Sequence, residues 1–156
     1  MKKTSRLRTR GLFVLSARTN PGPRKPVSFK HLPIKKPELR ALGQTLGELR
    51  IREIIRGFYA KMASDVMIGF FFTGRNLDQI AEMQSLFLFR AMGIRLSYTG
   101  KSPADAHSDL PPILTGHFDR RLKLLDEHLT QEGLSTAQRA TWVGFENAYR
   151  DSIVSL

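Results

Sequence analysis

Apolar residues recur three and four positions apart along most of the chain, which is the spacing of one face of an α-helix. The first amphipathic helix is predicted from about Leu46 to Met62. Its apolar face would hold Leu46, Leu49, Ile51, Ile54, Ile55, Phe58, Tyr59 and Met62. A second helix is predicted after Asn76, with Gly93 near its end. Its face would hold Leu77, Ile80, Gln84, Phe87, Leu88 and Ala91.

Start and stop signals predict a third, short helix. In the stretch 102–105, Ser102 is a suitable N-cap, Pro103 occupies the first helical position and Asp105 places a carboxylate in the first turn. The proline pair at 111–112 ends this segment.

Two more helices complete the pattern. One ends at Gly133, and another starts at Ser135 with Gln138 at capping-box spacing. Their apolar residues are Phe118, Leu122, Leu125 and Leu129 in the first, and Trp142, Phe145, Tyr149 and Ile153 in the second. Strand alternation and internal repeats are not seen, so we expect an all-α fold.

The length of 156 residues, 41% of them hydrophobic, suits one globular domain. Residues 1–50 hold 13 Lys or Arg against only Glu38 and Glu48, so the net charge of +11 belongs to this part. Residues 1–37 lack acidic residues and carry five of the eight prolines. We therefore predict a basic, Pro-rich, flexible extension over residues 1–43 and a globular domain over 44–156.

The role of the extension has several interpretations. The apolar stretch 11–17 after a basic start is compatible with a signal or transit segment. The alternatives are a basic arm that contacts an anionic membrane or nucleic acid, and a passive extension or misassigned start. We expect a cytoplasmic location.

Several classes of chemistry lack their required residues. The absence of cysteine excludes disulfides, thiolate metal sites and haem attachment through thioethers. An apolar run of the roughly 18 to 20 residues that a transmembrane helix needs is also lacking. Glycine-rich nucleotide motifs, a nucleophile elbow and paired-histidine motifs do not occur, so hydrolase and flavin or nicotinamide chemistry have no support.

Three polar residues interrupt the apolar faces. An unpartnered Gln84 amide within its stripe would cost about 1–3 kcal/mol, and the Tyr59 hydroxyl also needs a partner. The simplest interpretation is that each bonds a nearby carbonyl or the other. His107 lies on a helix of about one turn. His107, His117 and His128 are successively ten and eleven residues apart, so no metal-ligand spacing results. A site with one histidine needs a cofactor that supplies the remaining ligands, as haem does.

The order of these residues resembles the truncated haemoglobins, small globins with two antiparallel helix pairs around haem. The resemblance runs from Leu46 to Ile153. It rests on Phe58-Tyr59, the turn Phe70-Phe71-Phe72-Thr73-Gly74, Asn76, Gln84, Phe87, Gly93, Tyr98-Thr99-Gly100, His107 and His117-Phe118.

The resemblance implies a non-covalent haem b with His107 as the proximal iron ligand. It makes Tyr59 and Gln84 the distal pair that donates to bound dioxygen, with Ile80 at the distal gate, as in the first group of the family. The implied haem pocket comprises Phe58, Phe71, Phe72, Met83, Phe87, Leu88, Tyr98 and Phe118.

Three positions depart from the family. Gly93-Ile94 replaces a Gly-Gly pair, and Met83 replaces a basic residue that often pairs with a haem propionate, for which Arg75 or Arg95 are candidate substitutes. Arg121 stands where an apolar residue is common, so we expect a rotated helix or an outward guanidinium.

The resemblance implies reversible binding of dioxygen, with NO and CO as further ligands, and nitric oxide dioxygenase activity that depends on an external reductase. One alternative is a haem-based gas or redox sensor that docks through the basic extension. Another is a haem-free helical module that binds nucleic acid or an anionic membrane. The Soret absorption band of haem distinguishes these hypotheses: gas binding and sensing both require it, whereas a haem-free module lacks it.

Overall fold

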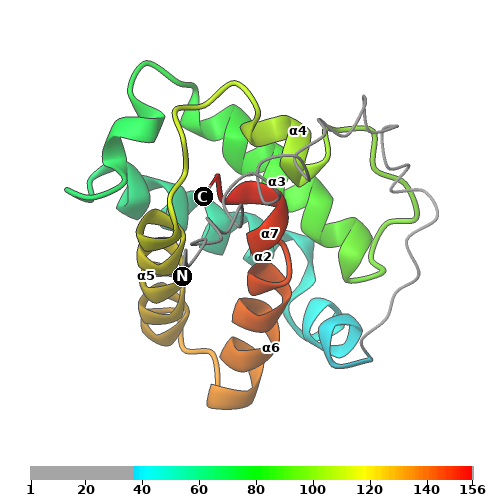
Figure 1. Cartoon of the computed structure of the whole chain (residues 1–156). Helices are drawn as coiled ribbons and strands as arrows, with labels where there is room; N and C mark the ends of the chain where they lie inside the picture. Colours follow the sequence, from blue (N-terminus) through cyan, green and yellow to red (C-terminus); the bar gives the residue numbers. More distant parts are fainter. Residues whose placement is uncertain (1–36, 156) are drawn as a thin grey trace, which may run out of the picture.

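The computed structural model describes residues 37–155, and this part of the chain consists of helices and loops without a strand (Figure 1). The predicted all-α class is confirmed. The elements are α2 (Pro37–Ala63), the 3-10 turn η2 (Gly69–Phe72), α3 (Leu77–Ala91), α4 (Pro103–His107), α5 (Thr115–Gln131), α6 (Thr136–Asn147) and α7 (Arg150–Ile153).

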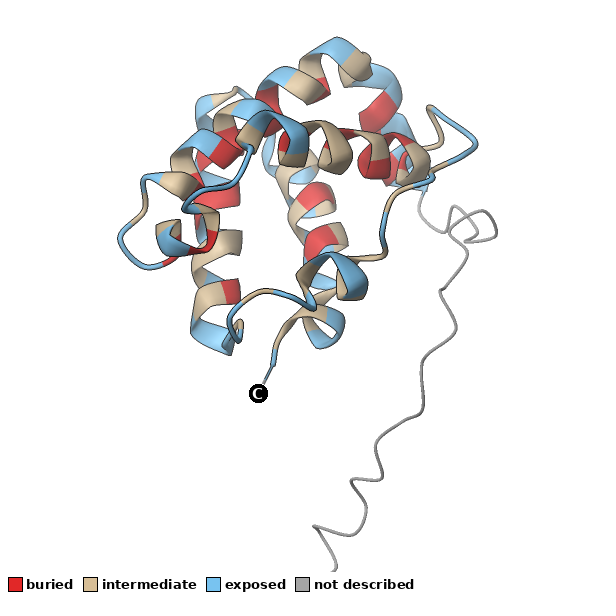
Figure 2. Ribbon diagram, turned by 90° about the horizontal axis from the view of Figure 1, so that it is seen from above, coloured by how far each residue is buried: buried red, intermediate tan, exposed pale blue. Residues whose placement is uncertain are grey.

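Two helix pairs form the body of the fold. Helix α2 packs against α3, α5 packs against α6, and α2 also contacts both α5 and α6, which joins the pairs. The buried positions lie on the sides of the helices that face one another, whereas the outer sides are exposed (Figure 2). The largest fully buried side chains include Trp142, Phe89, Phe118, Ile51, Ile54, Ile55 and Met62. Burial of apolar surface therefore holds the two pairs together.

Helix α2 is kinked at Gly47, which has φ 75° and ψ 166°. Only glycine adopts this conformation readily, because a Cβ would clash with the backbone. The kink changes which residues face inward: Leu49, expected on the apolar face, is 72% exposed, whereas Leu39 and Leu42 are buried. Residues 37–43, assigned to the extension by composition, are thus helical and contribute to the core.

The N-cap residues predicted from the sequence begin their helices as expected. The side chains of Asn76 and Ser102 accept hydrogen bonds from backbone N–H groups three residues on, and Ser135 forms a reciprocal capping box with Gln138. The last helix differs from expectation, because α6 ends at Asn147 and the separate α7 carries Ile153.

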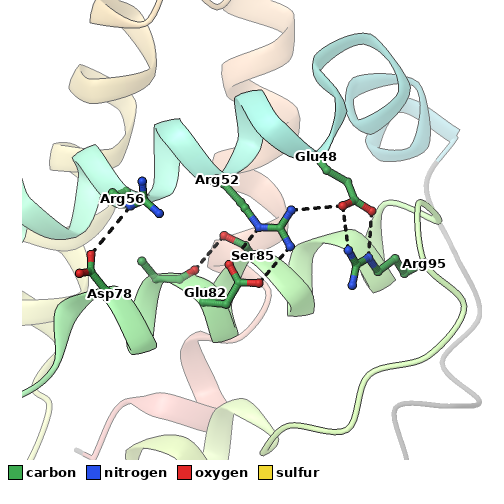
Figure 3. Close-up of polar contacts among 8 residues, drawn as sticks. Glu48, Arg52, Arg56, Asp78, Glu82, Ser85 and Arg95 are labelled. Carbon is green, nitrogen blue, oxygen red and sulfur yellow. Dashed lines mark hydrogen bonds and ion pairs between the residues drawn. The ribbon is translucent and has the colours of Figure 1, made fainter.

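A ladder of charged residues ties α2 to α3 and to the loop that follows α3 (Figure 3). Arg52 on α2 makes two hydrogen bonds of 2.9 Å with Glu82 on α3. Glu48 accepts from Arg52 at 3.2 Å and from two nitrogens of Arg95 at 2.8 Å. Arg95 and Arg52 thereby lower the pKa of the Glu48 carboxyl. The ladder fixes the start of the loop that leads to α4.

Asp65 organises the turn between α2 and η2. Its Oδ1 accepts from the backbone N–H of Met67 at 2.9 Å and of Ile68 at 3.3 Å, and its Oδ2 accepts from the Arg120 guanidinium at 2.7 Å. This carboxylate thus fixes η2, which carries Phe72, against α5.

Candidate functional site

A cavity of about 600 Å³ lies among α2, η2, α3, the loop before α4, α4, α5 and the C-terminal helices. Ten of the twelve residues proposed from the sequence line it: Tyr59, Phe71, Phe72, Ile80, Met83, Gln84, Phe87, Tyr98, His107 and Phe118. Most of the residues proposed from the sequence therefore lie at the cavity, although they make up less than half of its wall.

Two proposed pocket residues do not line the cavity. Phe58 is 3% exposed and packs in the core, where its ring stacks on His128. Leu88 is fully buried on α3. Both were placed in the pocket because their neighbours in sequence belong there, but they occupy the adjacent, core-facing side of their helices.

His107 is held at the C-terminal end of α4. Its Nδ1 lies 2.6 Å from the backbone carbonyl oxygen of Pro103, four residues earlier. Because a carbonyl only accepts, the ring proton sits on Nδ1 and Nε2 keeps its lone pair. Burial lowers the pKa of this imidazole, against the opposing effect of the Pro103 carbonyl. The result is a neutral imidazole whose lone pair is available to a metal.

Gln84 has a partner that the sequence analysis did not find. Its Nε2 donates to Oε1 of Glu146 on α6 at 3.0 Å, not to a backbone carbonyl or to Tyr59. Glu146 is 8% exposed and lines the same cavity. The signal was present in the sequence: Glu146 interrupts the apolar stripe that runs from Trp142 on α6 to Tyr149 just beyond the helix, as Gln84 interrupts the stripe on α3.

Arg121 points inward, contrary to the expected outward guanidinium or rotated helix. It lines the cavity, and its Nη1 donates to Oε2 of Glu146 at 2.9 Å. The side chains of Arg121 and Glu146 are 20% and 10% exposed. Burial raises the pKa of the neighbouring Tyr59 hydroxyl, and the charge of Arg121 opposes this effect. Tyr59, Gln84, Glu146 and Arg121 thus form one polar group in a wall that is otherwise mainly apolar.

The sequence model of the bacterial-like globin family matches residues 42–154 of this chain. The chain belongs to the bacterial-like globin family. A group 1 truncated haemoglobin of Chlamydomonas moewusii is 28% identical over 104 residues, which cover 66% of this globin and 61% of that relative. A group 1 truncated haemoglobin of Tetrahymena thermophila is 28% identical over 89 residues, 57% of this chain and 73% of the relative.

Solved structures show the same fold. The truncated haemoglobin of Tetrahymena pyriformis in its Fe(III) form superposes with a TM-score of 0.67 at 23% identity, covering 74% of this globin and 98% of that chain. The 2/2 haemoglobin of Synechococcus sp. PCC 7002, with covalently attached haem, superposes with a TM-score of 0.67 at 21% identity. The superposition covers 72% of this globin and 97% of that chain. The predicted truncated globin fold is confirmed, and assignment to the first group is consistent with the relatives.

The globin family implies haem as the cofactor, and the residues of the cavity fit it. Within residues 37–155, His, Asp and Glu do not gather into a group of three that could hold a metal ion by themselves. A cofactor that brings its own metal donors therefore suits a site with one available imidazole. His117 also lines the cavity, but its Nδ1 accepts from the backbone N–H of Leu114 at 3.1 Å, whereas the Nε2 of His107 keeps its lone pair. Phe71, Phe72 and Phe118 give the cavity the flat apolar walls that a porphyrin requires.

The cavity also has cationic residues for the acidic edge of a porphyrin. Arg75 and Lys101 line it, whereas Arg95 pairs with Glu48 in the ladder on α2. Of the two arginines considered as substitutes for the family's basic residue at Met83, only Arg75 lies at the cavity. Gly100 is also part of this wall, and a Cβ there would collide with the side chains of Tyr98 and Met83. The glycine therefore leaves room where the loop approaches α3.

The part of the chain that the structure describes has no helix with the length and apolarity to cross a membrane.

Proposed function

We propose that this globin holds non-covalent haem b in the cavity, where the His107 imidazole would bind its iron, and binds dioxygen reversibly. The observation that carries the proposal is the arrangement of His107, whose Nδ1 is tied to a carbonyl while the ring lines the same cavity as Tyr59 and Gln84. Non-covalent retention is supported by the absence of cysteine, which removes thioether attachment.

His107 is the residue that would anchor the cofactor. The bond from Nδ1 to Pro103 fixes the tautomer and the plane of the ring, as hydrogen bonds to metal-ligating histidines generally do. Anchoring would also stabilise α4, whose five residues are too few for an independent helix.

Tyr59 and Gln84 are the donors for the gas ligand. The phenol is buried and its pKa is raised, so it remains protonated at neutral pH and can donate. The amide of Gln84 has a second N–H beyond the one given to Glu146. Phe72 stands edge-on to Tyr59 at 5.8 Å between ring centroids and holds the phenol in place.

Haem, when bound, supplies an iron that binds diatomic gases reversibly, so NO and CO belong to the proposal as alternative ligands. Conversion of nitric oxide to nitrate with an external reductase stays a prediction from the resemblance. The sensor role, the contacts of the basic extension and the cytoplasmic location likewise stay predictions, and the extension lies outside the described residues.

Spectroscopy of the full chain tests the proposal. The protein is reconstituted with haem, reduced, exposed to oxygen and then deoxygenated. We expect a Soret band, and we expect the oxygenated and deoxygenated spectra to be the same in successive cycles. A chain that takes up no haem, or one that oxidises at once on exposure to oxygen and cannot be cycled, would contradict the proposal.

A further inference from the structure

We propose that Arg121 makes the cavity a binding site for small planar oxyanions, of which nitrite is the model, in addition to neutral gases. This inference rests on the proposed function, because the anion would occupy the same ligand space.

The first argument is the cost of the Arg121–Glu146 pair. Taking two charges out of water is expensive, and a buried ion pair is often no better for stability than apolar side chains of similar volume. Both side chains are at most one-fifth exposed, and both line a cavity whose remaining walls are mainly aromatic and aliphatic. The pair is therefore poorly explained by stability alone, and its position in a ligand cavity points to ligand binding.

The second argument is the hydrogen-bonding capacity of Arg121. A guanidinium carries five N–H donors in a planar fork, which matches two oxygens of a planar oxyanion. Glu146 accepts from Nη1 at 2.9 Å, so the fork is only partly used by this carboxylate. Both oxygens of Glu146 already accept hydrogen bonds, because Gln84 donates to the other oxygen.

The third argument is the position of the guanidinium. Arg121 on α5 lines the same cavity as Tyr59 on α2 and His107 on α4, which reach it from different elements. The guanidinium therefore lies on the wall of the space in which the gas ligand would bind.

Two variants separate the charge of Arg121 from its structural role. In Glu146→Gln the guanidinium remains without its counter-charge, so anion affinity should rise. The double variant Arg121→Met with Glu146→Gln removes both charges and avoids a lone buried carboxylate. Relative to Glu146→Gln, it should bind anions about ten- to a hundredfold more weakly, since charge-assisted hydrogen bonds contribute about that factor. Glu82→Gln is the matched control, because its carboxylate is ion-paired to Arg52 outside the cavity.

The measurement is equilibrium titration of the ferric, haem-loaded full chain with sodium nitrite at neutral pH, followed by the Soret shift. CO affinity of the reduced proteins is measured in parallel. We expect nitrite affinity to fall in the order Glu146→Gln, wild type, double variant. Glu82→Gln should resemble wild type for both ligands, and any change in CO affinity in the two Glu146 variants should be much smaller than the change in nitrite affinity. Equal nitrite affinity in the two Glu146 variants, or a parallel loss of CO affinity, would overturn the anion site and leave the gas-binding proposal standing. A wild-type chain that takes up no haem would overturn both.

Discussion

The side-chain amide of Gln84 on α3 donates to the Glu146 carboxylate on α6 over 3.0 Å, which links the two helix pairs through the cavity wall. A carboxylate only accepts hydrogen bonds, so the NH₂ end of Gln84, not its carbonyl, must face Glu146. The acidic residue therefore determines that Gln84 acts as a donor at this point of the cavity.

Replacing Tyr59 by Phe removes the buried hydroxyl and keeps the ring against Phe72. If the hydroxyl donates to dioxygen, the variant should release oxygen about ten- to a hundredfold faster, because a hydrogen bond to a partly charged acceptor contributes about 1.5–3 kcal/mol. Stopped-flow displacement of oxygen measures this rate. Carbon monoxide serves as the control ligand, because it accepts hydrogen bonds weakly and its release should change little. An unaltered oxygen off-rate would remove Tyr59 from the distal role.

Asp65 should give the fold a stability contribution that depends on pH. The Arg120 guanidinium, followed by the N–H groups of Met67 and Ile68, lowers the pKa of Asp65 below its ordinary value of 3.8. The contribution is therefore fully present above pH 3.8 and is lost as the pH falls through the lower, folded-state pKa.

Asp65→Asn retains an oxygen acceptor for the turn and removes the charge that faces Arg120. The variant should unfold at a lower urea concentration than wild type at neutral pH, and the difference should shrink as the pH falls below 3.8. Urea midpoints between neutral and strongly acidic pH provide the test. A difference that is constant with pH would show that the ion pair is not responsible.

Gly47→Ala should destabilise the fold by about 1–3 kcal/mol, because φ 75° with ψ 166° is a backbone conformation that side chains exclude. A Cβ at this position meets no atom within 4 Å, so the cost is conformational and not steric contact with a neighbour. Gly144→Ala is the control: it lies in α6 with equally open space and should stabilise by about 0.5–1 kcal/mol. Thermal unfolding distinguishes the two, and equal effects would contradict the role of the kink.

Deletions from the N-terminus should leave the domain intact only if they end before α2, which begins at Pro37. Deletion of residues 1–36 should preserve the haem spectrum and the melting temperature. Deletion of residues 1–43 also removes Leu39 and Leu42, each 4% exposed, and should lower the melting temperature markedly. Equal stability of the two truncated chains would favour the domain boundary at residues 43–44 that composition predicts.

Particular residues show how far the sequence leads. Gln84 and Tyr59 could be selected because each is polar within an apolar stripe. His107 could be selected because its predicted helix is too short to be stable without a further contact. The same test applied to α6 would have found Glu146. The kink at Gly47 could not be foreseen, because glycine within a helical pattern does not reveal its dihedral angles, and Leu49 was misplaced as a result.

The inward orientation of the Arg121 side chain could not be predicted from the local sequence pattern either. Its partner Glu146 is 25 residues away on another helix, and an arginine next to an apolar stripe ordinarily extends its charge toward water. Only the packing of α5 against α6 places the carboxylate within reach and turns the guanidinium into the cavity.

The central claim is that the imidazole of His107 carries the haem iron, and replacing this residue by glycine tests it most directly. The ferrous spectrum of His107→Gly is recorded with and without added imidazole, beside wild type and a His117→Gly control. We expect the five-coordinate ferrous spectrum to be lost in His107→Gly, restored by imidazole, and retained when His117 is replaced. An unchanged ferrous spectrum in His107→Gly without imidazole would contradict the account.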